Sequence, residues 1–124
     1  MSLAIRLFWG LLFHFVGDYL FQTHWVAINK VNKFFPAFIH ALVYSLPFIL
    51  ICFNWYWLII FVTHFFIDRY RLAKYWVWFI NRGSMENNGY PSGVPIWLST
   101  WLLFIVDNTF HILINSSVIY LVYS

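Results

Sequence analysis

The sequence predicts an all-α fold, an integral membrane four-helix bundle that forms a single transmembrane domain over residues 1–124. The first observation is composition: the chain is 63% hydrophobic and 9% charged, whereas a soluble domain typically carries about 25% charged residues. The second is length, because a chain of 124 residues is too short to hide so much apolar surface in a water-facing fold. The third is that four apolar runs alternate with short polar segments.

A spanning helix needs about 20 mostly apolar residues. The four runs that meet or approach this length are 3–22, 36–53, 55–71 and 96–123. The first contains His14 and Asp18 and no small-residue cleavage site follows it, so we interpret it as a retained span and not a signal peptide. Pro47 is expected to kink the second span, and helix can extend beyond the third as far as residue 80. The segment 81–95 is rich in Gly, Asn, Ser and Pro, which is typical of an exposed loop.

Lys and Arg residues predict the orientation. Lys30 and Lys33 follow the first span. Four more lie at or after the end of the third span: Arg69, Arg71, Lys74 and Arg82. Arg6 is the exception. Cytoplasmic loops collect such residues, so both termini are expected outside the cytoplasm. The cations form no long basic face, so the net charge of +3 does not predict a nucleic-acid partner. We interpret Arg69 and Arg71 as topology anchors, with binding of an anionic headgroup or phosphate as the alternative.

Ionisable side chains occur inside the apolar runs, where each costs about 2.5–3.5 kcal/mol on insertion scales and usually serves a function. They are His14, Asp18, His40, His64, Asp68, Asp107 and His111. Six of them form three pairs four residues apart, and such pairs share a helix face. In the first and third spans the Asp follows the His, which places the acid nearer the cytoplasm. The fourth span runs in the opposite direction, so its Asp-then-His order gives the same arrangement. A bundle would gather these groups in its cytoplasmic half.

Paired His and Asp on facing helices are how helix bundles build metal sites. The ligands that we predict are His14, Asp18, His64, Asp68 and Asp107, while His40 or His111 completes the shell or transfers protons. Zinc, manganese and iron all accept such ligands. Seven groups exceed one tetrahedral zinc shell, so either two metals bind or one binds with a supporting Asp or His. A hydrogen-bonded polar network and a proton or ion pathway are the other interpretations.

Several motifs carry a family resemblance: His14-Phe-Val-Gly-Asp18-Tyr-Leu-Phe-Gln22 with Lys30 after it, His40, His64-Phe-Phe-Ile-Asp68 and Asp107-Asn-Thr-Phe-His111. Over nearly the whole chain they resemble a small family of bacterial and phage membrane proteins, domain-of-unknown-function family 3307. The resemblance implies a multi-span protein of the bacterial inner membrane, often encoded in phages, with a distant similarity to membrane-bound metal-dependent hydrolases. Asn108 stands where the family pattern leads us to expect Gln, and both are amides.

The function that this sequence favours is metal-dependent hydrolysis of a membrane-associated lipid or phosphoester, in which the metal would activate water. One alternative is an oligomeric proton or ion channel or small transporter that uses the His/Asp cluster. Another is a non-catalytic phage membrane factor that binds a host membrane protein. The expected partners are the lipid bilayer and further copies of the chain. A water-filled path across the full thickness would favour transport, and a cytoplasmic pocket with a closed outer half would favour an enzyme.

Overall fold

The structure, a computed structural model, describes residues 1–52 and 54–124, and all regular structure in that part of the chain is helical. The prediction of an all-α fold is therefore confirmed. The helices are α1 (Leu3–Phe15), α2 (His24–Asn29), α3 (Phe34–Ser45), α4 (Trp57–Tyr70), α5 (Leu72–Asn81) and α6 (Ile96–Tyr123). A π-helical turn (Val16–Leu20) extends α1, a 3₁₀ turn (Leu46–Leu50) extends α3, and a short 3₁₀ turn (Met85–Asn87) precedes α6.

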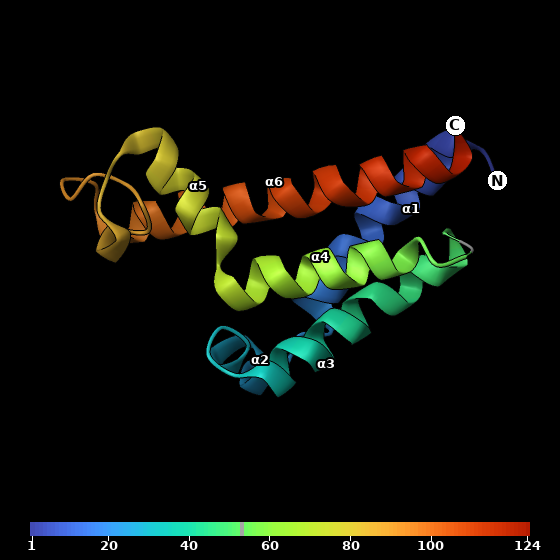
Figure 1. The fold of residues 1–124 in the computed structure, drawn as a ribbon, viewed down its shortest axis with the longest axis horizontal. Coiled ribbons are helices and arrows are strands. Elements are labelled where there is room, and N and C mark those ends of the chain that lie inside the picture. Colours follow the sequence, from blue (N-terminus) through green and yellow to red (C-terminus); the bar gives the residue numbers. More distant parts are fainter. Residues whose placement is uncertain (53) are drawn as a thin grey trace.

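Four of these helices, α1, α3, α4 and α6, run along the molecule and determine where the polar residues meet (Figure 1). Both termini lie at one end together with the turn between α3 and α4, while α2 and α5 lie towards the other end. Helix α3 packs on α4, α1 packs on α6, and α6 also contacts α4. The middle of each long helix therefore faces the middle of another.

The first apolar run is helical but changes its winding. The Ser2 hydroxyl caps α1 by accepting from the backbone N–H of Ile5 at 3.3 Å. After Phe15 the chain forms a π-helical turn, in which the N–H of Phe21 donates to the carbonyl of Val16 at 3.0 Å. Such i to i+5 turns occur often at functional sites. The first span was predicted to end at residue 22, and the π-helical turn ends at residue 20.

The third apolar run does not continue as one helix to residue 80. Arg71 adopts the left-handed conformation, with φ 50° and ψ 51°, and separates α4 from α5. This conformation costs about 1–2 kcal/mol for a residue with a Cβ atom. The break allows α5 to leave the direction of α4 and pack against α6. In the second run, Pro47 lies in the 3₁₀ turn, and the predicted end at Phe53 lies outside the described residues.

The buried apolar side chains of the described residues form separate clusters. The largest buried cluster lies towards the termini and consists of Tyr44, Phe48, Ile51, Cys52, Ile60, Val118 and Ile119. Smaller clusters join α3 to α4 through Ala37, Ala41 and Phe65, and α5 to α6 through Ala73, Val77 and Leu103. The buried ionisable residues lie between these clusters, where all four long helices contribute side chains.

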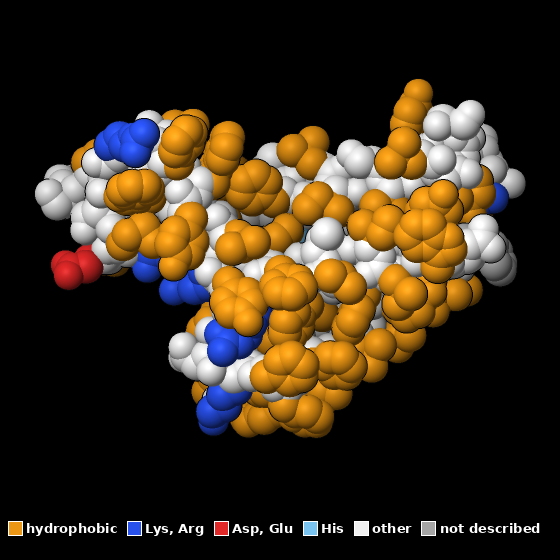
Figure 2. Space-filling view, viewed as in Figure 1, with side chains coloured by type: hydrophobic (Ala, Val, Ile, Leu, Met, Phe, Trp, Pro, Cys, Tyr) orange, Lys and Arg blue, Asp and Glu red, His pale blue; other side chains and the backbone are white. Residues whose placement is uncertain are grey.

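Among the described residues, two helices are long and apolar enough to cross a membrane: Leu3–Leu20 with 18 residues and Ile96–Tyr123 with 28 residues. This statement rests on length and composition alone. The segment Phe34–Leu50 is a shorter apolar helix, and α4 has 14 residues. Hydrophobic side chains cover much of the visible surface along the long helices, while most visible Lys and Arg side chains gather at the end that holds α2 and α5 (Figure 2).

Gly17 provides a test of how closely the π-helical turn approaches α3. A Cβ atom at this position would lie 2.6 Å from Cδ2 of Tyr44 and 3.2 Å from its Cα. Because the Tyr44 ring is itself stacked on His64, with centroids 3.6 Å apart, it has little room to move. We expect Gly17→Ala to lower the free energy of unfolding by about 1–3 kcal/mol, measured by denaturation of the purified protein. Gly93→Ala is the control, because a Cβ atom there meets nothing within 4 Å.

Candidate metal centre

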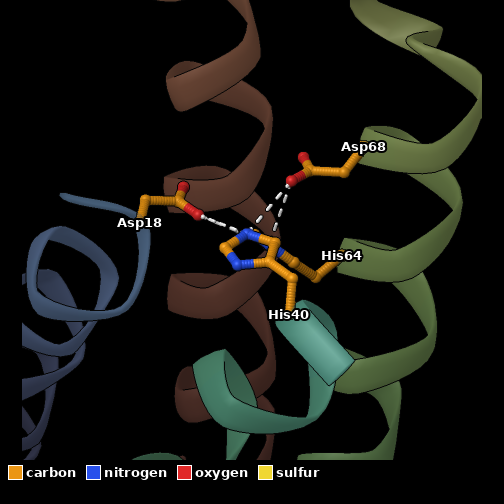
Figure 3. A group of neighbouring side chains, drawn as sticks. All are labelled: Asp18, His40, His64 and Asp68. Carbon is orange, nitrogen blue, oxygen red and sulfur yellow. Dashed lines mark hydrogen bonds and ion pairs between the residues drawn. The ribbon is translucent and has the colours of Figure 1, made fainter. Parts of the chain in front are cut away.

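Four buried side chains from three segments converge at the centre of the bundle (Figure 3). Asp18 comes from the π-helical turn, His40 from α3, and His64 and Asp68 from successive turns of α4. The two carboxylates approach the imidazoles from opposite sides (Figure 3). One ligand atom from each residue lies within 4.8 Å of the other three. The residues thus form a compact group of two nitrogens and two oxygens.

The distances between these ligand atoms fit a single metal ion. Nε2 of His40 lies 3.1 Å from Oδ1 of Asp18, 3.0 Å from Nε2 of His64 and 3.3 Å from Oδ2 of Asp68. Nε2 of His64 lies 3.4 Å from Oδ1 of Asp18 and 3.3 Å from Oδ2 of Asp68. A tetrahedral ion with bonds of about 2.0–2.1 Å would separate its ligand atoms by about 3.3–3.4 Å. These five distances match that spacing closely.

Hydrogen bonds between neutral histidines and the carboxylates satisfy only part of the group. Nε2 of His40 has Asp18, His64, Asp68 and the Lys30 amine all within 3.4 Å. A ring nitrogen of neutral histidine either donates one proton or accepts one, so it satisfies only part of this set. A cation placed between the four ligand atoms would satisfy them together. The chemistry of the donor set, two imidazoles and two carboxylates, suits zinc, manganese or iron.

A second group shares Asp68 with the first and adds Asp107 and His111 from α6. Nε2 of His111 lies 2.9 Å from Oδ1 of Asp68 and 3.3 Å from Oδ2 of Asp107. Asp68 therefore directs one carboxylate oxygen to each group. The side chain of Asp107 is 28% exposed, compared with 5% for Asp68. This second group is the more accessible one.

The two groups meet where Nδ1 of His64 lies 3.2 Å from Nδ1 of His111. A neutral imidazole that binds a metal through Nε2 carries its proton on Nδ1. With His64 bound in this way, its Nδ1–H donates to Nδ1 of His111, whose Nε2–H donates to Asp68. If His111 also bound a metal through Nε2, two N–H groups would face each other at 3.2 Å. Proton accounting therefore favours one cation, with His111 supporting its ligands.

His14 belongs to a separate chain of hydrogen bonds. The side-chain amide nitrogen of Asn108 donates to the backbone carbonyl of Phe104, which identifies the other amide atom, Oδ1, as the one that faces His14. This oxygen accepts from Nε2–H of His14 at 2.7 Å. Nδ1 of His14 then accepts from the Tyr44 hydroxyl at 2.7 Å, and that hydroxyl accepts from the Asn115 amide at 2.6 Å. Both ring nitrogens of His14 are therefore in use.

Lys30 reaches the group from the end of α2. Its amine donates to Oδ2 of Asp68 at 2.6 Å. Burial opposes the charge on the amine, but the carboxylates of Asp68 and Asp18 outweigh burial and raise the pKa of Lys30. A cavity of about 440 Å³ adjoins this contact, and among its lining residues are Lys30, Asp68, Arg71, Lys74 and Asp107. The buried group thus borders a space that contains both charges.

Six of the seven ionisable residues that the sequence singled out come together in the two groups, and His14 lies beside them. The prediction made His14 a ligand and let His40 either complete the shell or transfer protons. His40 lies in the first group, which agrees with the first of these two roles, and the grouping does not include His14. Sequence reasoning missed Lys30 and Tyr44. Tyr44 lies four residues after His40 and so on the same helix face, a signal that could have identified it. Lys30 was interpreted as a topology residue and as part of the family resemblance, and not as a partner of a buried acid.

Comparison with known proteins places this chain in a family without adding a function. The family described as "Protein of unknown function (DUF3307)" matches residues 7–123, which is nearly the whole chain. No curated protein matches the chain. No solved structure matches it either. The family match agrees with the resemblance carried by the His/Asp motifs, and the chain belongs to the DUF3307 family.

Proposed function

We propose that this protein is a membrane-embedded, metal-dependent hydrolase that acts on a membrane-associated lipid or phosphoester. The observation that carries the proposal is the buried group of Asp18, His40, His64 and Asp68, whose ligand atoms have the spacing of a metal shell. The adjoining cavity brings a second, partly exposed carboxylate, Asp107, to the same place. A cation site next to a reachable proton acceptor is the arrangement that metal-assisted hydrolysis uses.

The surface supports insertion in a membrane. Two helices are long and apolar enough to span a membrane. In each of them, only 22% of an apolar 18-residue segment is buried inside the protein. The core helix of a water-soluble protein is mostly buried, and soluble monomers rarely expose apolar patches above a few hundred Å². Here large hydrophobic side chains such as Phe8, Phe66 and Trp101 are exposed along the long helices. Lipid is the solvent that suits such a surface.

The two shorter segments are compatible with four spans. With 12 α-helical and 5 3₁₀ residues, Phe34–Leu50 is about 28 Å long. Helix α4, with 14 residues, is about 21 Å long, less than the hydrocarbon thickness of about 30 Å. Trp55 at one end and Arg69 at the other are residue types that anchor a short helix at the interfaces. The proposal is therefore a four-helix membrane bundle with a locally short third span.

Each residue of the site has a distinct role in this proposal. Asp18, His40, His64 and Asp68 hold the cation, and His111 fixes the Asp68 carboxylate by donating to its second oxygen. A divalent metal that accepts a further ligand beside these four would supply Lewis-acid activation of water and of the scissile group. Asp107 lines the cavity and is close enough to His111 to pass a proton into the buried network. We assign Asp107 as the proton acceptor of the reaction.

Metal content is the first test. Protein purified without chelator is expected to carry about one zinc, manganese or iron per chain, measured by elemental analysis. Asp68→Asn and His64→Ala remove ligands and are expected to lose most of the metal. His111→Ala should lower metal affinity by about 10–100-fold, the usual effect of removing a residue that orients a ligand. Glu86→Gln is the matched control, because it makes the same type of change at an exposed acid outside both groups.

Two results would contradict this assignment. Protein that holds no metal, and whose stability and activity are unchanged by a chelator, would favour a hydrogen-bonded network. Two metals per chain, with one lost in Asp107→Asn, would show that His111 is a ligand and that the single-cation arrangement is wrong.

Reconstituted liposomes separate an enzyme from a channel. We expect metal-dependent hydrolysis of a lipid or phosphoester with no proton or ion flux above that of empty liposomes. Asp107→Asn should keep its metal and lower kcat by about 100-fold or more, as expected for loss of a general base. Flux that Asp18→Asn abolishes would overturn the enzyme proposal, and the absence of both turnover and flux would favour a partner-binding factor.

The orientation of the chain has its own test. Because most Lys and Arg residues gather at the end that holds α2 and α5, we expect that end in the cytoplasm and both termini outside. A reporter that is active only outside the cytoplasm should be active when fused after Ser124 and inactive when inserted near Glu86. The opposite pattern would show that the cavity opens away from the cytoplasm.

A further inference from the structure

Three cationic side chains line the cavity beside the candidate metal centre, and they differ in how they are neutralised. Lys30 is paired with Asp68 at 2.6 Å. Arg71, at the junction of α4 and α5, and Lys74, on the first turn of α5, also line the cavity. Within residues 1–52 and 54–124, neither Arg71 nor Lys74 forms an ion pair with a carboxylate. The cavity therefore holds two positive charges that form no ion pair in the described part of the chain, and the partly exposed carboxylate of Asp107 lines the same cavity.

These two cations are close enough to influence each other. Burial and the positive charge of Arg71 both lower the pKa of Lys74. Two like charges brought together at a cavity wall repel each other unless an anion lies between them. Arg69, two residues before Arg71, provides a contrast, because its guanidinium donates to the carbonyls of Val31 and Asn32 and so fixes the loop before α3. Among the described residues, the Arg71 guanidinium makes no such bond to a backbone carbonyl.

Arg71 is one of two arginines that end a helix in the left-handed conformation, which favours glycine. Arg82 has the same φ of 50° and does not line the cavity, so this conformation alone does not indicate a ligand. What distinguishes Arg71 is its place in the cavity lining.

We propose that Arg71 and Lys74 form a binding site for the phosphate group of the substrate, which this cavity holds next to the candidate metal centre. The inference rests on the proposed function and narrows its substrate to a phosphate ester. A phosphate carries up to two negative charges and several oxygens, so it can pair with two neighbouring cations at once. The planar guanidinium of arginine binds two phosphate oxygens together, and lysine adds a point charge.

The other residues that line the cavity indicate the kind of molecule to which the phosphate is attached. Apolar side chains from α2 and α6, Ile28, Leu103 and Phe104, line the same cavity. Its volume of about 440 Å³ lies within the range of about 300–1,000 Å³ that is usual for small-molecule sites. Asp68 and Asp107 belong to the same lining. A phosphate held by Arg71 and Lys74 would thus share one cavity with a carboxylate of the metal group and with the proposed proton acceptor.

Arg71→Gly and Arg82→Gly form a matched pair for testing this site. Both arginines end a helix in the left-handed conformation with φ 50°, so glycine suits both backbones and both variants should fold. Arg82 does not line the cavity and instead lies over the rings of Trp78 and Phe79. The pair therefore separates loss of the guanidinium at the cavity from the general effect of removing an arginine.

The experiment measures binding of inorganic phosphate by calorimetry and binding of vesicles that contain phosphatidic acid, with phosphatidylcholine vesicles as reference. We expect Arg71→Gly and Lys74→Gln each to raise the Kd for phosphate about tenfold, and Arg82→Gly to leave it unchanged. Arg71→Lys should recover part of the affinity. Binding of phosphatidic acid vesicles that depends on Arg71 and is tighter than binding of free phosphate would identify a lipid source, and equal binding of the two would identify a soluble one.

These readouts also distinguish the inference from the proposed function. If the protein carries metal and hydrolyses its substrate but phosphate affinity is the same in the wild type, Arg71→Gly and Lys74→Gln, the phosphate site is wrong and the hydrolase proposal stands. If the protein carries no metal but phosphate affinity still depends on Arg71 and Lys74, the phosphate site stands and the metal centre is wrong. Equal losses of affinity in Arg71→Gly and Arg82→Gly would overturn the site, because they would show a non-specific effect of charge.

Discussion

The interior of this protein is organised around the need to balance one buried acid, Asp68. An ionised carboxylate taken out of water costs several kcal/mol unless charges and hydrogen bonds surround it. Here one oxygen faces Lys30, His40 and His64, and the other accepts from His111. These partners come from the end of α2 and from α3, α4 and α6. The same contacts that neutralise the acid therefore hold most of the helices in place, and the candidate site and the fold share one set of side chains.

Two interruptions of regular helix bring the other groups to Asp68. In the π-helical turn, Gly17 lets the backbone approach Tyr44, and the next residue, Asp18, reaches His40 at 3.1 Å. At Arg71 the left-handed conformation turns the chain away from α4, so that α5 packs against α6 and Arg71 lines the cavity. Both features cost local stability and both lie next to the candidate site, which is where strained or irregular backbone is often found in proteins.

Local patterns in the sequence predicted the helical fold and most of the candidate site. Apolar runs identify helices, and His and Asp four residues apart must share a helix face, so the spacing alone pairs His64 with Asp68. His14 shows the limit of this reasoning. Its spacing to Asp18 is the same, but Asn108 and Tyr44, from two other helices, take both of its ring nitrogens. Lys30 shows a second limit, because a lysine after a span has the same sequence signature whether it faces headgroups or folds back onto a buried acid.

Tyr44 marks the boundary between the polar and apolar parts of the interior. Its ring stacks on His64 and packs against Phe48 in the cluster nearest the termini, while its hydroxyl bonds to His14 and Asn115. In the described part of the chain, the buried residues beyond this ring include fully enclosed apolar side chains such as Ile60 and Ile119. A conducting path needs polar groups or a wettable constriction along its length. The cavity lies between α2, α4, α5 and α6. The described part of the bundle thus has apolar packing at one end and a charged cavity at the other, and the proposal of an enzyme, and not a channel, rests on this difference.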